Sequence, residues 1–255
     1  MMKIHHMNCV EIHSPGYGRA IGHCLLLETP QRLVLIDAGI GLMDTQNPFA
    51  RIGKQLIDIV GFKFDEQWTA IKRIEKLGLS PTNVTDCIIS HLDSDHIGGL
   101  VDFPNAKVHL GIEEYENFKS GNPRYLSQPL DHNPLIKTYP KSSQTWFDFE
   151  ARKVDIGSEI EIYLIPLFGH TLGHCGIALK NQSQWLLYVG DAYYLRDEIT
   201  DLNHPVNELA AMRADNNELR IAILNKIRHF IAEHPKIEVF GYHDINEFTA
   251  SEINK

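Results

Sequence analysis

The chain has 255 residues, of which 43% are hydrophobic and 22% are charged. A chain of this length and composition can bury a large core, which excludes an intrinsically disordered protein and predicts a single domain over residues 1–255. Its formal net charge of −9 repels phosphate backbones, and no basic patch in the sequence offsets that charge, so we expect no nucleic-acid partner.

The four cysteines, Cys9, Cys24, Cys87 and Cys175, are scattered and form no C-x-x-C pair, which argues against a zinc ribbon or a disulfide framework. No segment approaches the run of about 18 apolar residues that a membrane span needs. Residues 1–9 also lack a basic segment followed by an apolar run. We therefore expect a soluble cytoplasmic protein with no membrane part, and the sequence leaves open whether it forms a homodimer.

The N-terminal third combines two strands with two helices. Apolar runs at residues 20–28 and 32–37, separated by a Thr-Pro-Gln turn, predict strands. Apolar residues at helical spacing predict helices at residues 47–60 and 66–77. Gly78 follows the second helix at the position where a glycine commonly ends one.

The middle of the chain carries short elements and one long polar stretch. Residues 86–90 and 108–110 predict strands, and residues 112–119 predict a helix. Residues 120–150 are rich in prolines and polar residues with scattered aromatics, and they are long for a plain connection. Two interpretations stay open for this stretch: a lid or pocket-lining insertion, or a surface loop with no role.

The C-terminal part alternates strands with one long helix. Apolar runs predict strands at residues 159–166, 175–180, 184–190 and 236–240, and an amphipathic pattern predicts a helix at residues 216–233. The apolar side of that helix is predicted to contain Leu219, Ile223, Ile227 and Phe230. This order of strands and helices is typical of two packed sheets with helices outside.

The densest group of candidate metal ligands follows the strand predicted at residues 86–90. Four of them fall within six residues: His91, Asp93, Asp95 and His96. A tight turn at a strand end can aim several side chains at one point. Because imidazoles and carboxylates this close together would be costly to bury without a cation, the segment predicts a metal site.

Three further candidate ligands each stand directly after a predicted strand. His170 lies in a Gly-His-Thr segment, Asp191 follows Gly190, and His243 follows the last predicted strand. A single aspartate or histidine at a strand end is weak evidence, since such residues often only form turns. Together, at the edge of packed sheets, they are expected to converge on the same metal site.

The order His-x-Asp-x-Asp-His, Gly-His-Thr-x-Gly-His, Gly-Asp and a C-terminal histidine resembles the metallo-β-lactamase superfamily over nearly the whole chain. The resemblance implies an α+β fold, the αββα sandwich of two packed mixed sheets with helices on the outer faces, and two divalent metal ions. It also implies that His174 supports the site rather than binding metal. The ligands that it implies are His91 and His170 for the first ion, Asp95, His96 and His243 for the second, and Asp191 for both.

Asp93 departs from the family pattern, which has histidine at this position. A carboxylate there would either give the first metal an anionic oxygen ligand or leave that metal one ligand short. Oxygen ligands shift the preference of a site from zinc toward manganese or iron. Zinc is therefore the first expectation, manganese or iron are the alternatives, and the role of Asp93 as a ligand stays open.

The resemblance implies hydrolysis by a hydroxide held between the two metal ions, because bound metal lowers the pKa of water toward about 7. Asp95 would orient that hydroxide. Tyr194 stands where N-acyl-homoserine lactonases, the quorum-quenching members, have a tyrosine that hydrogen-bonds the lactone carbonyl, although Tyr193 beside it leaves a packing role open. Residues 47–61, with Phe62 and Phe64, would then help to cover an acyl chain.

We therefore expect a hydrolase that acts on a lactone or ester bond of a small acyl substrate. Two alternatives stay open. A glyoxalase-II-like thioesterase would need a cationic pocket for the carboxylates of a glutathione-like substrate. A non-catalytic sensor would bind metal or ligand without turnover.

Overall fold

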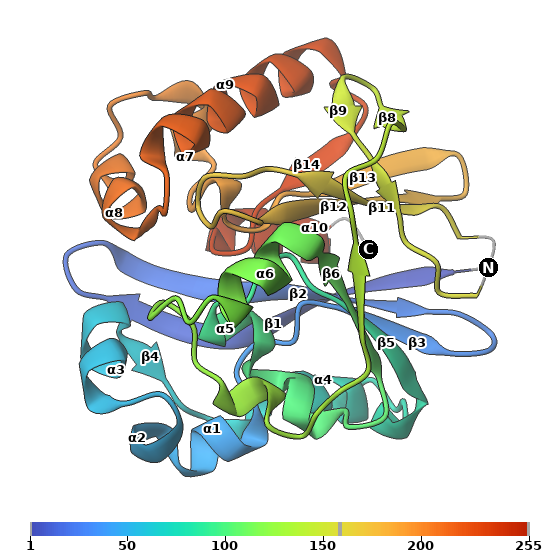
Figure 1. The fold of residues 1–255 in the computed structure, drawn as a ribbon, viewed down its shortest axis with the longest axis vertical. Coiled ribbons are helices and arrows are strands. Elements are labelled where there is room, and N and C mark those ends of the chain that lie inside the picture. Colours follow the sequence, from blue (N-terminus) through green and yellow to red (C-terminus); the bar gives the residue numbers. More distant parts are fainter. Residues whose placement is uncertain (1, 158–159, 254–255) are drawn as a thin grey trace.

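The computed structural model describes residues 2–157 and 160–253, whose strands form two large sheets packed face to face (Figure 1). The first sheet has seven strands, in the order β4 (Phe62–Lys63), β1 (Lys3–Ser14), β2 (Gly18–Glu28), β3 (Leu33–Ile36), β5 (Val84–Ile88), β6 (Lys107–Gly111) and β7 (Ile136–Tyr139). The second has five, in the order β10 (Arg152–Lys153), β11 (Ile162–Pro166), β12 (Cys175–Asn181), β13 (Gln184–Tyr188) and β14 (Glu238–Phe240). A separate pair consists of β8 (Thr145–Trp146) and β9 (Phe149–Glu150).

Both sheets are mixed, and this brings several strand ends to one place. In the first sheet β1, β2 and β3 are antiparallel, whereas β3, β5, β6 and β7 run parallel. In the second sheet β12 runs antiparallel to β11 and β13, and β14 is parallel to β13. The carboxyl ends of β11, β13 and β14 therefore lie at the same edge of that sheet.

Helices cover the outer faces of both sheets, which confirms the predicted αββα sandwich (Figure 1). On the side of the first sheet lie α1 (Leu42–Gln46), α2 (Pro48–Arg51), α3 (Lys54–Val60) and α4 (Ala70–Lys76). On the side of the second lie α7 (Asp197–Thr200), α8 (Val206–Arg213) and α9 (Asn217–Glu233). The other helices are α5 (Ser94–Ile97), α6 (Ile112–Lys119) and α10 (Ile245–Ile253), with 3₁₀ turns η1 (Glu66–Trp68), η2 (Pro81–Asn83), η3 (Gly98–Asp102), η4 (Gln128–Leu130) and η5 (Gly190–Ala192).

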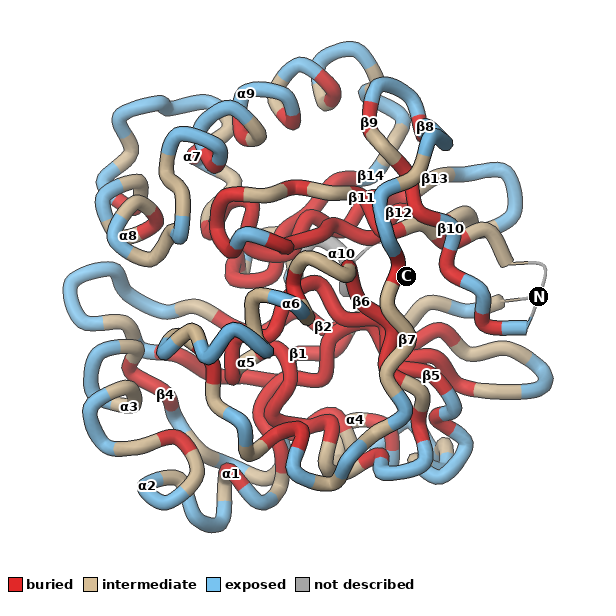
Figure 2. Tube along the Cα trace, in the orientation of Figure 1, coloured by how far each residue is buried: buried red, intermediate tan, exposed pale blue. Residues whose placement is uncertain are grey.

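The core fills the space between the sheets, where Figure 2 shows the buried residues concentrated. Leu25 and Ile36 of the first sheet and Tyr188 of the second are fully buried in the same apolar cluster. A second cluster lies under α9, where Ile227 and Phe230 pack on the outer face of the second sheet. Burial on both faces explains the near-continuous apolar runs of the central strands.

Several predicted elements need correction. The helix expected at residues 47–60 is broken into α2 and α3 by Gly53, whose φ of 89° a helix does not allow. The polar stretch at residues 120–150 is not a plain loop, because it contributes β7 to the first sheet as well as η4, β8 and β9. Residue 159, where one predicted strand began, lies outside the described residues.

β1 was not predicted at all, although residues 7–12 of this strand are buried.

Among the helices of the described residues, none combines the length and the apolar character that crossing a membrane requires.

Candidate metal centre

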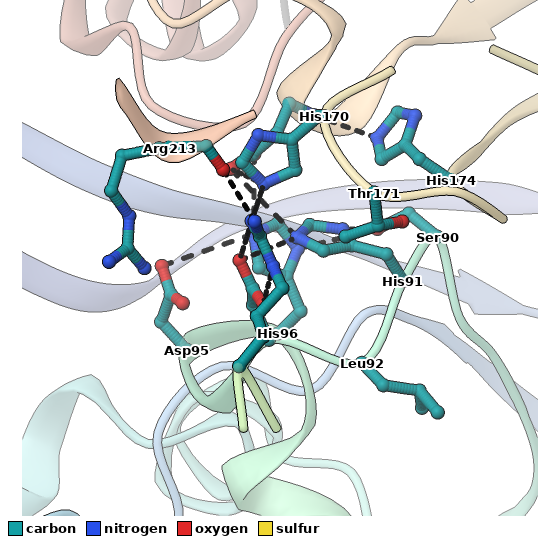
Figure 3. Close-up of polar contacts among 12 residues, drawn as sticks. Ser90, His91, Leu92, Asp95, His96, His170, Thr171, His174 and Arg213 are labelled. Atoms are coloured by element: carbon teal, nitrogen blue, oxygen red, sulfur yellow. Dashed lines mark hydrogen bonds and ion pairs between the residues drawn. The ribbon is translucent and has the colours of Figure 1, made fainter. Parts of the chain in front are cut away.

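The candidate ligands project from strand ends at the edge that the two sheets share. The segment after β5 supplies His91, Asp95 and His96, the last two from α5. The segments after β11, β13 and β14 supply His170, Asp191 and His243. In Figure 3 the imidazoles of His91, His96 and His170 point toward one another. The sequence places each ligand-bearing segment directly after a strand: His91, Asp191 and His243 follow the last strand residue by three positions, and His170 follows it by four.

His91, His170 and Asp191 form a first group that could hold a metal ion. One ligand atom from each lies within 4.8 Å of the other two, and all three residues are buried. Asp191 Oδ2 lies 3.4 Å from His170 Nε2 and 4.0 Å from His91 Nε2. Two imidazoles and one carboxylate are a ligand set that zinc and other divalent transition metals bind.

Asp95, His96 and His243 form a second such group, again within 4.8 Å. Asp95 Oδ2 lies 3.9 Å from His96 Nε2 and 3.8 Å from His243 Nε2. Asp191 reaches this group as well, because its Oδ1 is 3.2 Å from His96 Nε2 and its Oδ2 is 3.2 Å from His243 Nε2. The Asp191 carboxylate therefore lies between the two groups.

Unpartnered polar atoms show that these residues fit a cation. His91 Nε2, His96 Nε2 and Asp191 Oδ1 are buried and have no hydrogen-bond partner among the described residues. Leaving three such atoms unpaired in a protein interior costs free energy that a bound ion would recover. The residues present thus suit two divalent ions, one in each group.

Asp37, at the end of β3, orients one of the imidazoles. Its fully buried carboxylate accepts hydrogen bonds from the backbone N–H of Ser90 (2.8 Å), the Ser90 hydroxyl (2.7 Å), the Tyr188 hydroxyl and His96 Nδ1 (2.8 Å). With the proton of His96 held on Nδ1, the lone pair of Nε2 faces the second ligand group.

His174 supports the site, as expected, and both its ring nitrogens are engaged. Its Nδ1 donates to the carbonyl of Leu167 (3.1 Å), and its Nε2 accepts the backbone N–H of Asp191 (3.1 Å). Burial lowers the pKa of His174 to about 3, so the ring stays neutral and keeps this acceptor role. Its part is to fix the backbone from which Asp191 projects.

Glu114, which the sequence did not single out, joins the two ligand-bearing loops. This buried residue of α6 accepts hydrogen bonds from the backbone N–H of Leu92 (2.8 Å) and from the hydroxyls of Thr171 (2.6 Å) and Tyr125 (2.9 Å). Leu92 adjoins His91 in sequence, and Thr171 adjoins His170. Burial raises the pKa of Glu114 to about 7.

Charges inside the centre shift the pKa values of His91 and His96 in opposite directions. Burial, together with the neighbouring His96, lowers the pKa of His91 well below its usual value. For His96, burial opposes the charged form, but the carboxylates of Asp191 and Asp37 outweigh it and raise the pKa. A metal ion must therefore displace a proton from His96, which makes binding weaker in acid.

Asp93 lies beside the first group but is engaged elsewhere. Its Oδ2 is 3.2 Å from His170 Nε2 and 3.4 Å from His91 Nε2. Both of its oxygens, however, accept hydrogen bonds from the guanidinium of Arg124, at 2.6 Å each. No sequence signal pointed to Arg124, which comes from the polar stretch at residues 120–150.

A pocket opens next to the two groups, and Tyr194 lies in its wall. Its lining includes the ligands Asp95, Asp191 and His243 and the apolar side chains of Ile12, Ile59, Val60, Tyr194, Val206 and Leu209. The ring of Tyr194 lies 5.2 Å from that of His243. Tyr193, in contrast, is fully buried, and its hydroxyl donates to Glu247 (2.9 Å).

The segment expected to cover an acyl chain reaches this pocket only in part. Ile59 and Val60 of α3 line it, whereas Phe62 and Phe64 pack with the hydrophobic core. The polar stretch at residues 120–150 contributes none of its lining.

The fold and the two ligand groups define an αββα protein with a candidate dinuclear metal centre. The chain belongs to the Metallo-beta-lactamase superfamily, whose sequence profile matches residues 17–228. It is 32% identical over 200 residues to a probable metallo-hydrolase of Mycobacterium tuberculosis, a match that covers 76% of this chain and 64% of that protein. The chain thus spans slightly less than two thirds of the length of this relative.

More distant similarity extends to N-acyl homoserine lactonases, in sequence and in fold. An N-acyl homoserine lactonase from a Bacillus species is 24% identical over 225 residues, which is 88% of this chain and 81% of that protein. The crystal structure of an N-acyl homoserine lactone hydrolase with the product N-hexanoyl-L-homoserine at its catalytic metal centre superposes with a TM-score of 0.74. That match covers 97% of this chain and 95% of the other at 18% identity, so it shows the shared fold.

Proposed function

We propose that this protein is a dinuclear metal-dependent hydrolase that opens a lactone or ester bond of a small acyl substrate. The observation that carries the proposal is the position of the pocket. Ligands from both groups line it together with apolar side chains. A reactive carbonyl beside the ligands and an acyl chain against the apolar side chains would fill such a space.

In this proposal His91, His170 and Asp191 hold the first ion, and Asp95, His96 and His243 hold the second, with Asp191 reaching both. Zinc suits this set of imidazoles and carboxylates, and manganese or iron are the alternatives. When bound, divalent ions lower the pKa of water toward neutrality and polarise a carbonyl oxygen.

Asp95 and Tyr194 would act directly on the reacting groups. Asp95 lines the pocket beside His243, where its carboxylate can hold and orient the proton of the attacking water. Burial, with the nearby Asp191, raises the pKa of Tyr194 well above its usual value. The phenol therefore stays protonated at neutral pH and can donate a hydrogen bond to the carbonyl oxygen of the substrate.

Tyr194→Phe tests this role, with Tyr193→Phe as the matched control. Loss of one donor that acts mainly in the transition state typically lowers kcat by about 100-fold or more. We expect a decrease of that order for Tyr194→Phe on an N-acyl homoserine lactone, unchanged metal content, and no comparable loss for Tyr193→Phe. Equal activity of wild type and Tyr194→Phe on lactones, esters and thioesters would exclude the proposed role of Tyr194.

Two guanidinium groups in the same pocket favour one alternative substrate class. Arg19 and Arg213 both line it, and Arg19 is already paired with Glu11 (3.0 Å). Arg213 is thus placed to contact the carboxylates of a glutathione-like thioester. Measuring kcat/KM for lactones, neutral esters, anionic thioesters and phosphodiesters distinguishes these substrate classes. Metal or ligand binding without any turnover would instead identify a sensor.

A further inference from the structure

A guanidinium from the polar stretch at residues 120–150 reaches the first ligand group. Arg124 lies between α6 and η4, and its backbone N–H is held by the side-chain oxygen of Asn122 (3.0 Å). The Arg124 side chain is only 11% exposed. Its Nη1 donates to the carbonyl of Arg213 and approaches Asp215 (3.3 Å), so the residue is anchored at the base of α9 as well.

Asp93 and Arg124 form a buried bidentate pair. Nε of Arg124 donates to Oδ1 of Asp93 and Nη2 donates to Oδ2, each at 2.6 Å. Fork-to-fork pairs of this kind are among the strongest hydrogen-bonded contacts in proteins. A carboxylate held at both oxygens is poorly available to a metal ion, so the geometry gives Asp93 a different partner from the one expected for a ligand.

The same guanidinium also engages a nitrogen of the first group. Arg124 Nη2 lies 2.8 Å from His170 Nε2, the nitrogen that faces Asp191 at 3.4 Å. An imidazole nitrogen has one lone pair, which can accept a hydrogen bond or bind a metal ion but not both. A fixed positive charge at hydrogen-bond distance also repels an incoming cation.

The second group has no such competitor. Among the described residues, no lysine or arginine forms an ion pair with Asp95 or a hydrogen bond with His96 or His243. Each imidazole of this group instead donates a hydrogen bond from its Nδ1, which leaves its Nε2 able to bind a metal ion. His96 Nδ1 donates to Asp37 (2.8 Å), and His243 Nδ1 donates to the carbonyl of Ile21 (2.9 Å).

From this asymmetry we propose that Arg124 and the first metal ion compete for His170, so that the second group binds its ion tightly and the first group binds weakly. Asp93 anchors the competing guanidinium rather than serving as a ligand. In the protein with one ion, Arg124 supplies positive charge beside the Asp93 carboxylate and the His170 ring. This inference rests on the proposed function, because it assumes that both groups bind metal.

Zinc titration of the metal-depleted full chain against a chromophoric chelator tests the competition without any activity measurement. In the wild type we expect one tightly bound zinc ion, in the second group, and one weakly bound zinc ion, in the first group. The dissociation constant of the weak ion should be at least about tenfold higher. Arg124→Met frees His170 and leaves the Asp93 carboxylate without its partner. The weak zinc ion of the first group should then bind roughly 10- to 100-fold more tightly, the range over which residues around metal ligands change affinity.

Arg32→Met is the matched control, because Arg32 is also a partly buried arginine that pairs with an aspartate, Asp86, and a backbone carbonyl. It should leave both dissociation constants unchanged. His170→Ala should abolish the weak ion, and His243→Ala the tight one. If Arg124→Met does not fold, Arg124→Lys, which cannot form the bidentate pair, should also tighten binding of the weak ion, but by less.

Two equally tight ions in the wild type would overturn the inference. An Arg124 variant whose weak ion binds no more tightly than in the wild type would overturn it as well. Either result would leave the proposed function intact. A wild-type protein that binds no zinc, manganese or iron would overturn the proposed function itself, so the two failures are distinguishable.

Discussion

Replacing Asp37 by asparagine should destabilise the fold and also weaken metal binding at the second ligand group. Asp37 has a φ of 50°, a conformation that asparagine also tolerates, so Asp37→Asn changes little but the side-chain chemistry. Oδ1 accepts from the backbone of Ser90, and Oδ2 accepts from Ser90 Oγ, Tyr188 and His96. Either orientation of the amide therefore turns its NH₂ group toward a donor.

The size of the effect follows from these contacts. One buried donor left without an acceptor costs about 1–3 kcal/mol, which we expect as the loss in the free energy of unfolding of the metal-free protein. A second effect of similar size should fall on the metal. If His96 moves its proton to Nε2 to accept from the amide, that nitrogen can no longer bind an ion, and affinity at the second group should fall about 10- to 100-fold.

Asp86→Asn is a control of the same chemistry away from the centre. Asp86 is buried in β5 and pairs with the buried His109 (2.8 Å), as Asp37 pairs with His96. Urea denaturation followed by circular dichroism should show comparable destabilisation of both variants, whereas a zinc competition titration should show weaker binding only for Asp37→Asn. Wild-type affinity in Asp37→Asn, or an equal loss in Asp86→Asn, would refute the reasoning.

Two further variants probe the contact between α6 and the loop that bears His170. Because burial raises the pKa of Glu114 from 4.5 to about 7, the stability that its neutral form contributes is complete below pH 4.5 and is lost as the pH rises through 7. At 1.36 kcal/mol per pKa unit this amounts to about 3 kcal/mol. The free energy of unfolding of the metal-free wild type, relative to that of Glu114→Gln, should therefore fall by that amount between pH 4 and 8. A difference that stays constant with pH would contradict the prediction. Gly173→Ala would place a Cβ 2.0 Å from the backbone nitrogen of Glu114, so we expect calorimetry to show a destabilisation of about 1–3 kcal/mol. Gly121→Ala is the control, because nothing lies within 4 Å of the added atom, and it should be destabilised only by its backbone strain.

The sequence was most informative where the chemistry is local. His91, His170 and His243 each follow a short apolar strand, and strand ends at one edge of a sheet meet in space whatever the rest of the chain does. Neither the pairing of Asp93 with Arg124 nor the bridge formed by Glu114 could be predicted, because these contacts join elements whose relative position only the folded structure defines.

The long C-terminal helix shows the same limit. Its bounds were predicted from the amphipathic pattern to within one residue. In the structure Asn216 caps the helix by accepting a hydrogen bond from the backbone of Leu219. Its buried side was predicted less well, since Leu219 is exposed, whereas Arg220 is buried against Glu198. Hydrophobic spacing identifies a helix but cannot show that an ion pair takes up part of the packed face.

Each ligand group draws residues from both sheets: His91 with His170 and Asp191 in one, Asp95 and His96 with His243 in the other. A bound ion would therefore act as a removable cross-link across the interface between the sheets. Openings that separate the sheets would have to release the ion, and they would become rarer by the factor 1 + [metal]/Kd. Amide hydrogen exchange in β5 and β13, which lie in different sheets, should therefore slow together when metal is added, while the exposed turns should exchange as before.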